Sequence, residues 1–155
     1  MIFLQHLVYV YHSLLRDVRI TAPVVIIKRH GASTGKEFTP KTLSSIISGL
    51  RANGIHRNLC IMGGEPLCPE NLFLTHMIIK AVKDALPDTK VYIWTGYFYE
   101  NLIKRKDGRT PQILELADVL IDGPYIQAER DITLPMRGSR NQRIINLREV
   151  YHEKA

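Results

Sequence analysis

The chain has 155 residues, of which 45% are hydrophobic and 23% are charged, and this composition indicates one globular domain and excludes a disordered protein. The formal net charge of +6 is unevenly spread, because four basic residues and one acidic residue give residues 1–34 a charge of +3, whereas basic and acidic residues are interspersed from residue 35 onward. A mixed surface of this kind argues against a nucleic-acid partner.

The N-terminal residues and the cysteines indicate the compartment. Residues 1–15 are uncharged, but they are too short and too often interrupted by polar side chains for a membrane span, and they lack the basic start of a signal peptide. The two cysteines, Cys60 and Cys68, provide neither a disulfide framework nor a Cys-x-x-Cys metal site. We therefore expect a soluble protein of the reducing cytoplasm with no membrane partner.

The segment His30-Gly-Ala-Ser-Thr-Gly-Lys36 follows an apolar run and looks like a phosphate-binding loop. Such a loop needs four residues between its glycines and a Ser or Thr after the lysine. Here three residues separate the glycines, and Glu37 follows the lysine. We therefore expect no nucleotide at this loop.

Helices and strands alternate from residue 39 onward. Thr39-Pro40 caps and begins a helix with an apolar stripe that runs to Leu50. Apolar and alternating patterns then predict strands and helices in turn, with strands at 59–62, 90–94 and 117–121 and helices at 69–86, after 97 and around 114–116. This order predicts one α/β domain of parallel strands with helical crossovers, either an α/β layer or a partial barrel.

A turn containing glycine follows each of these three strands. The turns are Gly63-Gly64-Glu65-Pro66, Thr95-Gly96-Tyr97 and Asp122-Gly123-Pro124. Ligands bind at the carboxyl ends of strands in such sheets, and glycine permits positive φ and close backbone approach. The first turn is therefore a candidate ligand site, with an ordinary strand-to-helix turn as the alternative.

A polar loop that begins at Met136 leads into a short apolar strand ending near Ile145. Its side chains Arg137, Asn141 and Gln142 have the chemistry to bind a carboxylate or a phosphate. Ordinary surface-loop hydrogen bonding explains the same residues equally well, so their role stays open at this point.

Five segments in this order and spacing resemble the anaerobic ribonucleoside-triphosphate reductase activating proteins, a family of radical S-adenosylmethionine enzymes. They are Gly35-Lys-Glu-Phe-Thr39, Met62-Gly-Gly-Glu-Pro-Leu67, Ile93-Trp-Thr-Gly-Tyr97, Val119-Leu-Ile-Asp-Gly-Pro124 and Arg137-Gly-Ser-Arg-Asn-Gln-Arg143. The resemblance covers residues 35–147 and implies a partial radical-SAM (β/α) barrel. It also implies an activase that cleaves S-adenosylmethionine at a [4Fe-4S] cluster and generates the glycyl radical of its partner, the anaerobic reductase.

The resemblance further implies which residues hold the cofactor. The amino group of S-adenosylmethionine docks at the Gly-Gly-Glu-Pro turn in such enzymes, and carbonyl oxygens and a carboxylate suit an ammonium group. Thr95 and Asp122 are implied to lie beside the cofactor, while no catalytic residue is assigned. The implied cofactor-binding residues are Gly63, Gly64, Glu65, Pro66, Thr95 and Asp122.

The cluster ligands of this family are missing. Its [4Fe-4S] cluster is held by three cysteines spaced C-x3-C-x2-C ahead of the first helix, and residues 1–34 contain no cysteine. The chain therefore supplies no metal ligands of this kind, and we expect it to be inactive as written. We divide it into an aberrant segment, residues 1–34, and a radical-SAM-like α/β domain, residues 35–155.

A displaced reading frame explains the missing cysteines. If each codon takes the last base of one residue and the first two bases of the next, cysteine appears only where the second residue is Val or Ala. The pairs with the required offsets are Asp17-Val18, Thr21-Ala22 and Val24-Val25. The displaced frame can then read G-C-x-x-x-C-P-G-C-H-N-K-T-S-W, which looks like the family's cluster loop. A frameshift, in the gene or in its sequencing, is one hypothesis.

The alternative to a frameshift is a native protein without these cysteines. It would be a non-catalytic protein that binds the cofactor or the reductase. A basic nucleic-acid binder is a third reading, for which the sequence supplies no aromatic and basic surface motif.

Overall fold

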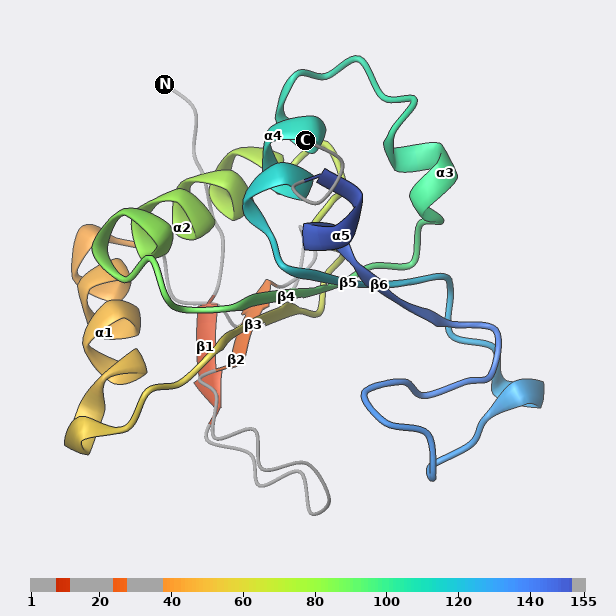
Figure 1. The fold of residues 1–155 in the computed structure, drawn as a ribbon, viewed down its shortest axis with the longest axis horizontal. Helices are drawn as coiled ribbons and strands as arrows, with labels where there is room; N and C mark the ends of the chain where they lie inside the picture. Colours follow the sequence, from red (N-terminus) through yellow and green to blue (C-terminus); the bar gives the residue numbers. More distant parts are fainter. Residues whose placement is uncertain (1–7, 12–23, 28–37, 152–155) are drawn as a thin grey trace.

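The computed structural model describes residues 8–11, 24–27 and 38–151. These residues form one sheet with the strand order β1-β2-β3-β4-β5-β6 (Figure 1). The strands are β1 (Val8–Tyr11), β2 (Val24–Ile27), β3 (Leu59–Met62), β4 (Val91–Trp94), β5 (Val119–Asp122) and β6 (Arg143–Asn146). The helices are α1 (Pro40–Leu50), α2 (Leu72–Ala85), α3 (Tyr99–Leu102), α4 (Arg109–Leu116) and α5 (Leu147–Tyr151), with short 3₁₀ turns at Ala52–Gly54 and Gln127–Glu129.

The sheet is mixed and open. β2, β3, β4 and β5 are parallel to one another, whereas β1 and β6 pair with their neighbours in the antiparallel direction at the two edges. The predicted parallel strands with helical crossovers are thus confirmed for β3, β4 and β5. Two sequence predictions lie outside the described residues, namely the loop His30–Lys36 and most of the aberrant segment 1–34.

Several element boundaries differ from the prediction, and hydrogen bonds explain two of these differences. The helix expected from residue 69 begins at Leu72, because the N–H of Cys68 donates to Glu65 and the N–H of Asn71 to Cys68, which closes two turns first. The strand expected from residue 117 begins at Val119, since the N–H of Ala117 still donates to Ile113 and ends α4.

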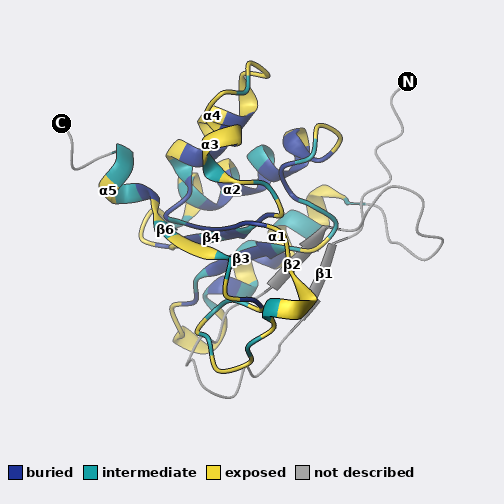
Figure 2. Ribbon diagram, turned by 90° about the vertical axis from the view of Figure 1, so that its right-hand side faces the viewer, coloured by how far each residue is buried: buried dark blue, intermediate teal, exposed yellow. Residues whose placement is uncertain are grey.

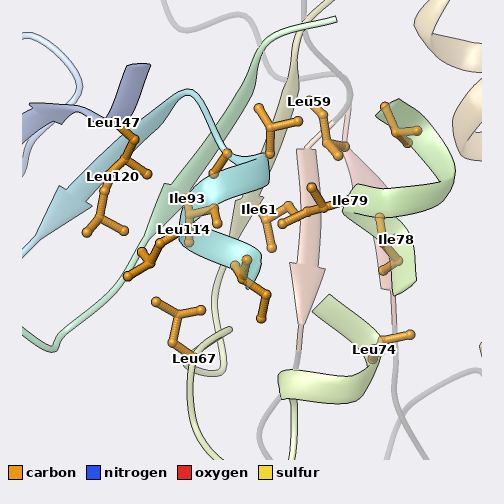
Figure 3. Packing of buried hydrophobic residues seen from close by; sticks show 14 of the residues in the cluster. Leu59, Ile61, Leu67, Leu74, Ile78, Ile79, Ile93, Leu114, Leu120 and Leu147 are labelled. Carbon is orange, nitrogen blue, oxygen red and sulfur yellow. The ribbon is translucent and has the colours of Figure 1, made fainter. Parts of the chain in front are cut away.

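The main core lies between the sheet and the helices, which Figure 1 shows on one side of the strands. Because side chains alternate along a strand, Leu59 and Ile61 of β3 enter this core with Ile93 of β4, and α2 adds Ile78 and Ile79 (Figure 3). Each fully buried side chain of this kind contributes about 1.5–3 kcal/mol. Figure 2 shows the buried residues concentrated along this layer. The face of the sheet that carries these apolar side chains is therefore the face that the helices cover.

The opposite face of the sheet carries a smaller cluster. Cys60 and Met62 of β3 lie there with Tyr92 and Trp94 of β4. The indole Nε1–H of Trp94 donates to the carbonyl of Met136 at 2.8 Å, which ties the long segment between β5 and β6 beneath this face. The sheet therefore has helices on one side and this irregular segment on the other (Figure 1).

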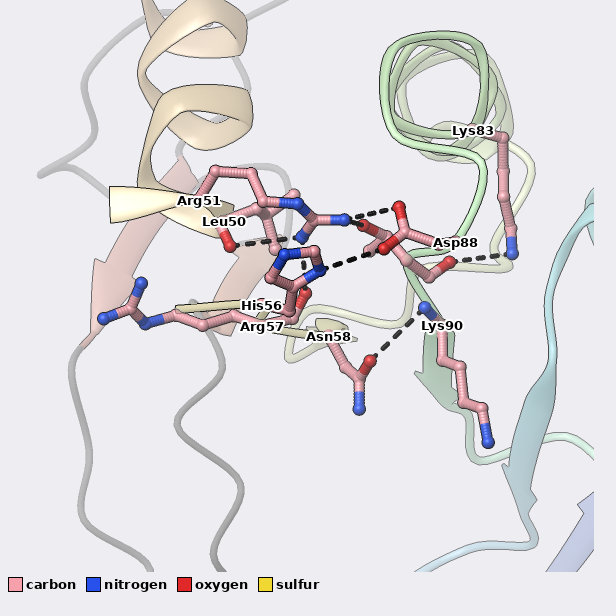
Figure 4. A network of polar contacts seen from close by, with 9 residues as sticks. Leu50, Arg51, His56, Arg57, Asn58, Lys83, Asp88 and Lys90 are labelled. Carbon is pink, nitrogen blue, oxygen red and sulfur yellow. Dashed lines mark hydrogen bonds and ion pairs between the residues drawn. The ribbon is translucent and has the colours of Figure 1, made fainter. Parts of the chain in front are cut away.

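A network of polar contacts joins α1 to the connection between α2 and β4 (Figure 4). The guanidinium of Arg51 donates to the Asp88 carboxylate at 2.6 Å and to the Thr89 hydroxyl at 3.0 Å. The buried Arg57 donates to the carbonyls of Gly49 and Ala52, near the C-terminal end of α1. These contacts fix the amino-terminal side of β3 and β4.

Asp118 is the most heavily bonded carboxylate on that side. It accepts hydrogen bonds from Lys83 Nζ at 2.7 Å, from the N–H of Val91 at 2.7 Å and from Arg148 Nε at 2.6 Å. Burial opposes ionisation of Asp118, but these three donors outweigh it and hold its pKa below the ordinary value of 3.8. Asp118 thereby links α2, β4 and α5.

We predict that Asp118→Asn lowers the free energy of unfolding at pH 7 by about 3 kcal/mol, because Lys83 is left nearly buried without its charged partner. Since the folded-state pKa of Asp118 lies below its unfolded value, this stabilisation is complete above about pH 4 and is lost as the pH falls through the folded pKa. The gap between variant and wild type should therefore shrink in acid, measured by urea unfolding at pH 7 and pH 3.

The control is Asp84→Asn, which removes an exposed ion pair with Lys80 one helical turn away. It should change the free energy of unfolding by no more than about 0.5 kcal/mol. A loss for Asp118→Asn no larger than that of the control, or a loss that is the same at both pH values, would contradict the assigned role.

Candidate functional site

The three predicted turns lie at one edge of the sheet, at the carboxyl ends of β3, β4 and β5. The N–H of Thr95 donates to the carbonyl of Ile121 at 2.9 Å, and the N–H of Gly123 donates to that of Tyr97 at 3.1 Å. The turns after β4 and β5 are therefore joined by backbone hydrogen bonds. A site at the carboxyl ends of parallel strands is where ligands bind in such sheets.

The turn after β3 has an unusual backbone. Gly63, Gly64 and Glu65 have φ values of 75°, 52° and 56°, so three consecutive residues lie in the left-handed region. Glycine adopts this region freely, whereas Glu65 does so at a cost of about 1 kcal/mol. Other interactions must therefore hold Glu65 in place.

The carboxylate of Glu65 supplies these interactions. Its Oε1 accepts from the Thr95 hydroxyl at 2.6 Å and from the N–H of Leu67 at 3.1 Å, and its Oε2 accepts from the N–H of Gly96 at 2.8 Å. The Thr95 hydroxyl in turn accepts from the N–H of Tyr97 at 3.2 Å. Two of the predicted site residues, Glu65 and Thr95, are thus brought into direct contact, and the end of β3 is joined to the end of β4.

Pro66, another predicted site residue, is buried behind this turn. Its carbonyl accepts a hydrogen bond of 2.8 Å from the hydroxyl of Thr75, which lies on α2 and is fully buried. Gly63 is exposed and Gly64 is partly exposed. The turn therefore has an inner side anchored to α2 and an accessible side at its glycines.

Asp122 has a different environment from Glu65 and Thr95. Its side chain is fully buried and accepts from Arg143 through a two-pronged contact, with Nε at 2.9 Å from Oδ1, and from the N–H of Tyr99 at 2.8 Å. Arg143 also forms paired hydrogen bonds of 2.9 and 2.8 Å with Glu100, and these lower the pKa of Glu100 to about 2. Within the described part of the chain, Asp122 therefore joins β5, β6 and α3 and makes no hydrogen bond to Glu65.

The polar loop residues Arg137, Asn141 and Gln142 hold the loop itself. The guanidinium of Arg137 donates to the carbonyl of Gln142 at 3.1 Å, and the amide of Asn141 donates to that of Pro124 at 2.7 Å. The amide of Gln142 donates to the carbonyl of Gly123 at 3.1 Å and accepts from two N–H groups of its own loop. These contacts account for loop hydrogen bonding by all three side chains, while the buried Nε of Arg137 has no hydrogen-bond partner among the described residues and remains available as a donor.

The cysteines of the chain do not fit an iron-sulfur cluster. Cys60 is buried on β3, and burial raises the pKa of its thiol to about 12. Burial and a hydrogen bond with Glu70 also raise the pKa of the Cys68 thiol. Thiolates are the usual cluster ligands, and the full chain has only these two cysteines. The described residues also contain no group of three or more His, Cys, Asp or Glu side chains arranged to hold a metal ion.

The contacts of three residues that shape this edge of the sheet were not predicted from the sequence. Gly96 presents its N–H to Glu65, Arg143 neutralises Asp122, and Asn71 donates to the turn after β3. Arg143 ends one of the quoted motifs, and Asn71 lies within the helix predicted at 69–86, so both belonged to segments that the sequence had identified. The sequence did not indicate which residues they would bond to.

Comparison with known proteins gives one consistent family. The model of a protein family described as "4Fe-4S single cluster domain" matches residues 27–145. The anaerobic ribonucleoside-triphosphate reductase-activating protein of Pasteurella multocida is 40% identical over 109 residues, which are 70% of this chain and 68% of the relative. The protein of the same description from Vibrio cholerae is 36% identical over 111 residues, 71% of this chain and 69% of the relative.

A more distant relative comes from a virus. The anaerobic ribonucleoside-triphosphate reductase-activating protein of Enterobacteria phage T4 is 32% identical over 115 residues, which are 73% of this chain and 67% of the relative. No solved structure was found to match the chain. The matches therefore rest on sequence and cover most of the described domain.

We predict that Glu65→Gln lowers the free energy of unfolding by about 1–3 kcal/mol, because an amide has one acceptor oxygen and its NH₂ would face N–H donors that the carboxylate now satisfies. Urea unfolding measures the change. The matched control is Glu149→Gln, since Glu149 accepts a single exposed hydrogen bond from Asn146 that an amide oxygen can also accept. Equal effects of the two variants would show that the Glu65 contacts stabilise nothing.

Proposed function

The chain belongs to the family of anaerobic ribonucleoside-triphosphate reductase-activating proteins, and we propose that residues 38–151 form the scaffold with which this family binds S-adenosylmethionine in order to activate the reductase. The observation that carries the proposal is the braced turn after β3. Gly63 and Gly64 leave backbone accessible at the carboxyl end of a parallel strand, while Glu65 fixes that backbone to the neighbouring strand.

The chemistry of the turn suits the amino group of the cofactor. An ammonium group needs oxygen acceptors, and backbone carbonyls together with the negative charge of Glu65 supply them. Pro66 and Thr95 support the turn from behind and from the side. Asp122 lies at the end of β5 and would act beside the cofactor through the element that it fixes with Arg143.

A partial (β/α) barrel is the architecture that we propose for the complete domain. Helices cover one face of the parallel strands, and the opposite face carries the side chains of Cys60, Met62, Tyr92 and Trp94. In an open barrel segment the helices lie outside and the other face of the strands points inward, and the one-sided helices seen here support the proposal.

The partner that we propose is the anaerobic ribonucleoside-triphosphate reductase, which the descriptions of the relatives name as the protein that they activate. No helix among the described residues is long and apolar enough to cross a membrane. A cytoplasmic setting is our proposal, consistent with two cysteines that form no disulfide.

We further propose that this chain is inactive as an activase, because it lacks the three thiolates of the family's cluster loop. The first 34 residues would then be the displaced-frame translation of a segment that encodes this loop. Three Val or Ala codons fall at the offsets of C-x3-C-x2-C, and the flanking residues permit the rest of the motif. The match to the family model begins at residue 27, after the three positions at which the displaced frame can encode cysteine.

The polypeptide should hold no stoichiometric cluster when it is reconstituted anaerobically with iron and sulfide, because Cys60 and Cys68 are too few and one of them is buried. Iron and sulfide analysis with absorption spectroscopy measures this. Adventitious iron should be the same in a Cys60→Ser, Cys68→Ser double variant. A clean [4Fe-4S] spectrum with about four iron atoms per chain would defeat the prediction.

The coding DNA should use GAT for Asp17, ACT for Thr21 and GTT for Val24, because only a final T turns the next Val or Ala codon start into cysteine. A final T at His30 is expected as well, since it completes a tryptophan codon in the displaced frame. Sequencing of the gene measures all four bases. Correcting the frame between residues 32 and 35, with an upstream start in the displaced frame, should restore cluster binding and cleavage of S-adenosylmethionine.

Another third base at Asp17, Thr21 or Val24 would remove that cysteine and with it the frameshift hypothesis. The better reading would then be the non-catalytic one, in which a native protein binds the cofactor or the reductase without a cluster. Titration of this chain with S-adenosylmethionine and, separately, with the reductase would show which of the two it binds.

A further inference from the structure

The five consecutive backbone carbonyls of residues 63–67 differ in whether a donor of the protein occupies them. The side-chain NH₂ of Asn71 donates to the carbonyl of Gly64 at 2.9 Å and to that of Glu65 at 3.0 Å. The Thr75 hydroxyl occupies the carbonyl of Pro66, and Arg105 occupies that of Leu67. The remaining carbonyl is that of Gly63. No hydrogen-bond donor among the described residues reaches it, and Gly63 is exposed.

Asn71 stands at the residue that precedes α2, where an asparagine ordinarily caps the helix with its side-chain oxygen. Its side chain makes no such capping bond here. It is instead only 3% exposed and gives both amide hydrogens to the turn. Asp, Ser and Thr are comparable capping residues, but none of them has an NH₂ group with two donors. The identity of this residue is therefore explained by the turn and not by the helix.

We propose that Asn71 is a positioning residue of the cofactor site, acting through the turn that it holds; this rests on the function proposed above. By occupying the carbonyls of Gly64 and Glu65, it holds their peptide groups in the left-handed conformation and leaves the carbonyl of Gly63 as the open acceptor for the ligand's ammonium group. Without Asn71, the carbonyl of Gly64 loses its side-chain donor and that of Glu65 keeps only the N–H of Cys68, so the peptide groups of the turn are held less firmly.

Arg105 supports the same arrangement from the other side. Its guanidinium donates to the carbonyl of Leu67 and stacks over the ring of Tyr97 at 4.1 Å. Tyr97 belongs to the turn after β4, so the turn after β3 is held between α2 and the neighbouring turn. The residue that ends this segment, Leu67, is thus anchored to the neighbouring turn.

The test compares Asn71→Ala with Thr75→Val in this chain. Thr75→Val is the matched control, because it removes another buried donor from α2 to the same segment but leaves the carbonyls of Gly64 and Glu65 bonded. Hydrogen exchange is measured at the N–H of Cys68, which donates to the Glu65 carbonyl. Relative to wild type, we expect exchange there to be about tenfold faster in Asn71→Ala and nearly unchanged in Thr75→Val.

Affinity for S-adenosylmethionine is then measured by calorimetry on the same three proteins. Asn71→Ala should bind at least about tenfold more weakly than wild type, and Thr75→Val within about threefold of it, even if the two variants unfold at similar temperatures. If Asn71 had a purely structural role, two variants of similar stability would also have similar affinities.

The outcomes distinguish the two proposals. If the wild-type chain binds S-adenosylmethionine and Asn71→Ala binds it equally well, the role of Asn71 is refuted while the proposed function stands. If the wild-type chain does not bind, the proposed cofactor site of this chain fails, and hydrogen exchange still decides whether Asn71 holds the turn. Unchanged exchange at Cys68 in Asn71→Ala refutes the role of Asn71 in either case.

Discussion

The hydrogen bonds of the Glu65 carboxylate are the interaction on which the functional edge of this protein depends. They join the end of β3 to the end of β4 through the hydroxyl of Thr95 and the N–H of Gly96. A turn with three successive left-handed residues is unfavourable on its own, and one of the three is not glycine. The hydrogen bonds of the carboxylate offset that cost. The turn therefore keeps its shape only while the carboxylate stays bonded to the end of β4.

The two ends of the parallel strands are stabilised in different ways. At the amino ends, carboxylates such as Asp118 and Asp88 pair with Lys83, Arg148 and Arg51, and these contacts join helices to the sheet. At the carboxyl ends of β3 and β4, the donors to Glu65 are backbone N–H groups and the Thr95 hydroxyl, and among the described residues no cation pairs with its negative charge. An edge of that kind can receive a positively charged ligand group.

Much of the fold could be predicted from the sequence because local patterns determine it. The apolar spacing of α1 and α2 and the short apolar runs of β3, β4 and β5 gave the order of elements and the parallel sheet. The glycines indicated the turns, whereas the hydrogen bond between Glu65 and Thr95, two residues predicted separately, was found only in the structure. The partners of Asn71 and Arg143 could not be predicted, because a side chain's direction depends on contacts between segments far apart in the sequence. Asn71 in particular occupies a capping position whose usual bond it does not make.

The chain matches a family with a 4Fe-4S cluster, but it lacks the cysteines that would bind one. The match and the missing cysteines lie in different parts of the chain. The described residues retain the turn that we propose receives an ammonium group, whereas the residues ahead of it lack every thiolate of the cluster loop. The most direct measurement is a crystal structure of the frame-restored protein with S-adenosylmethionine. It should show the ammonium group against the carbonyl of Gly63, with Glu65 still bonded to Thr95 and Gly96. An ammonium group bound away from this turn, or a Glu65 that leaves Thr95 and Gly96 on binding, would contradict the central role given to the braced turn.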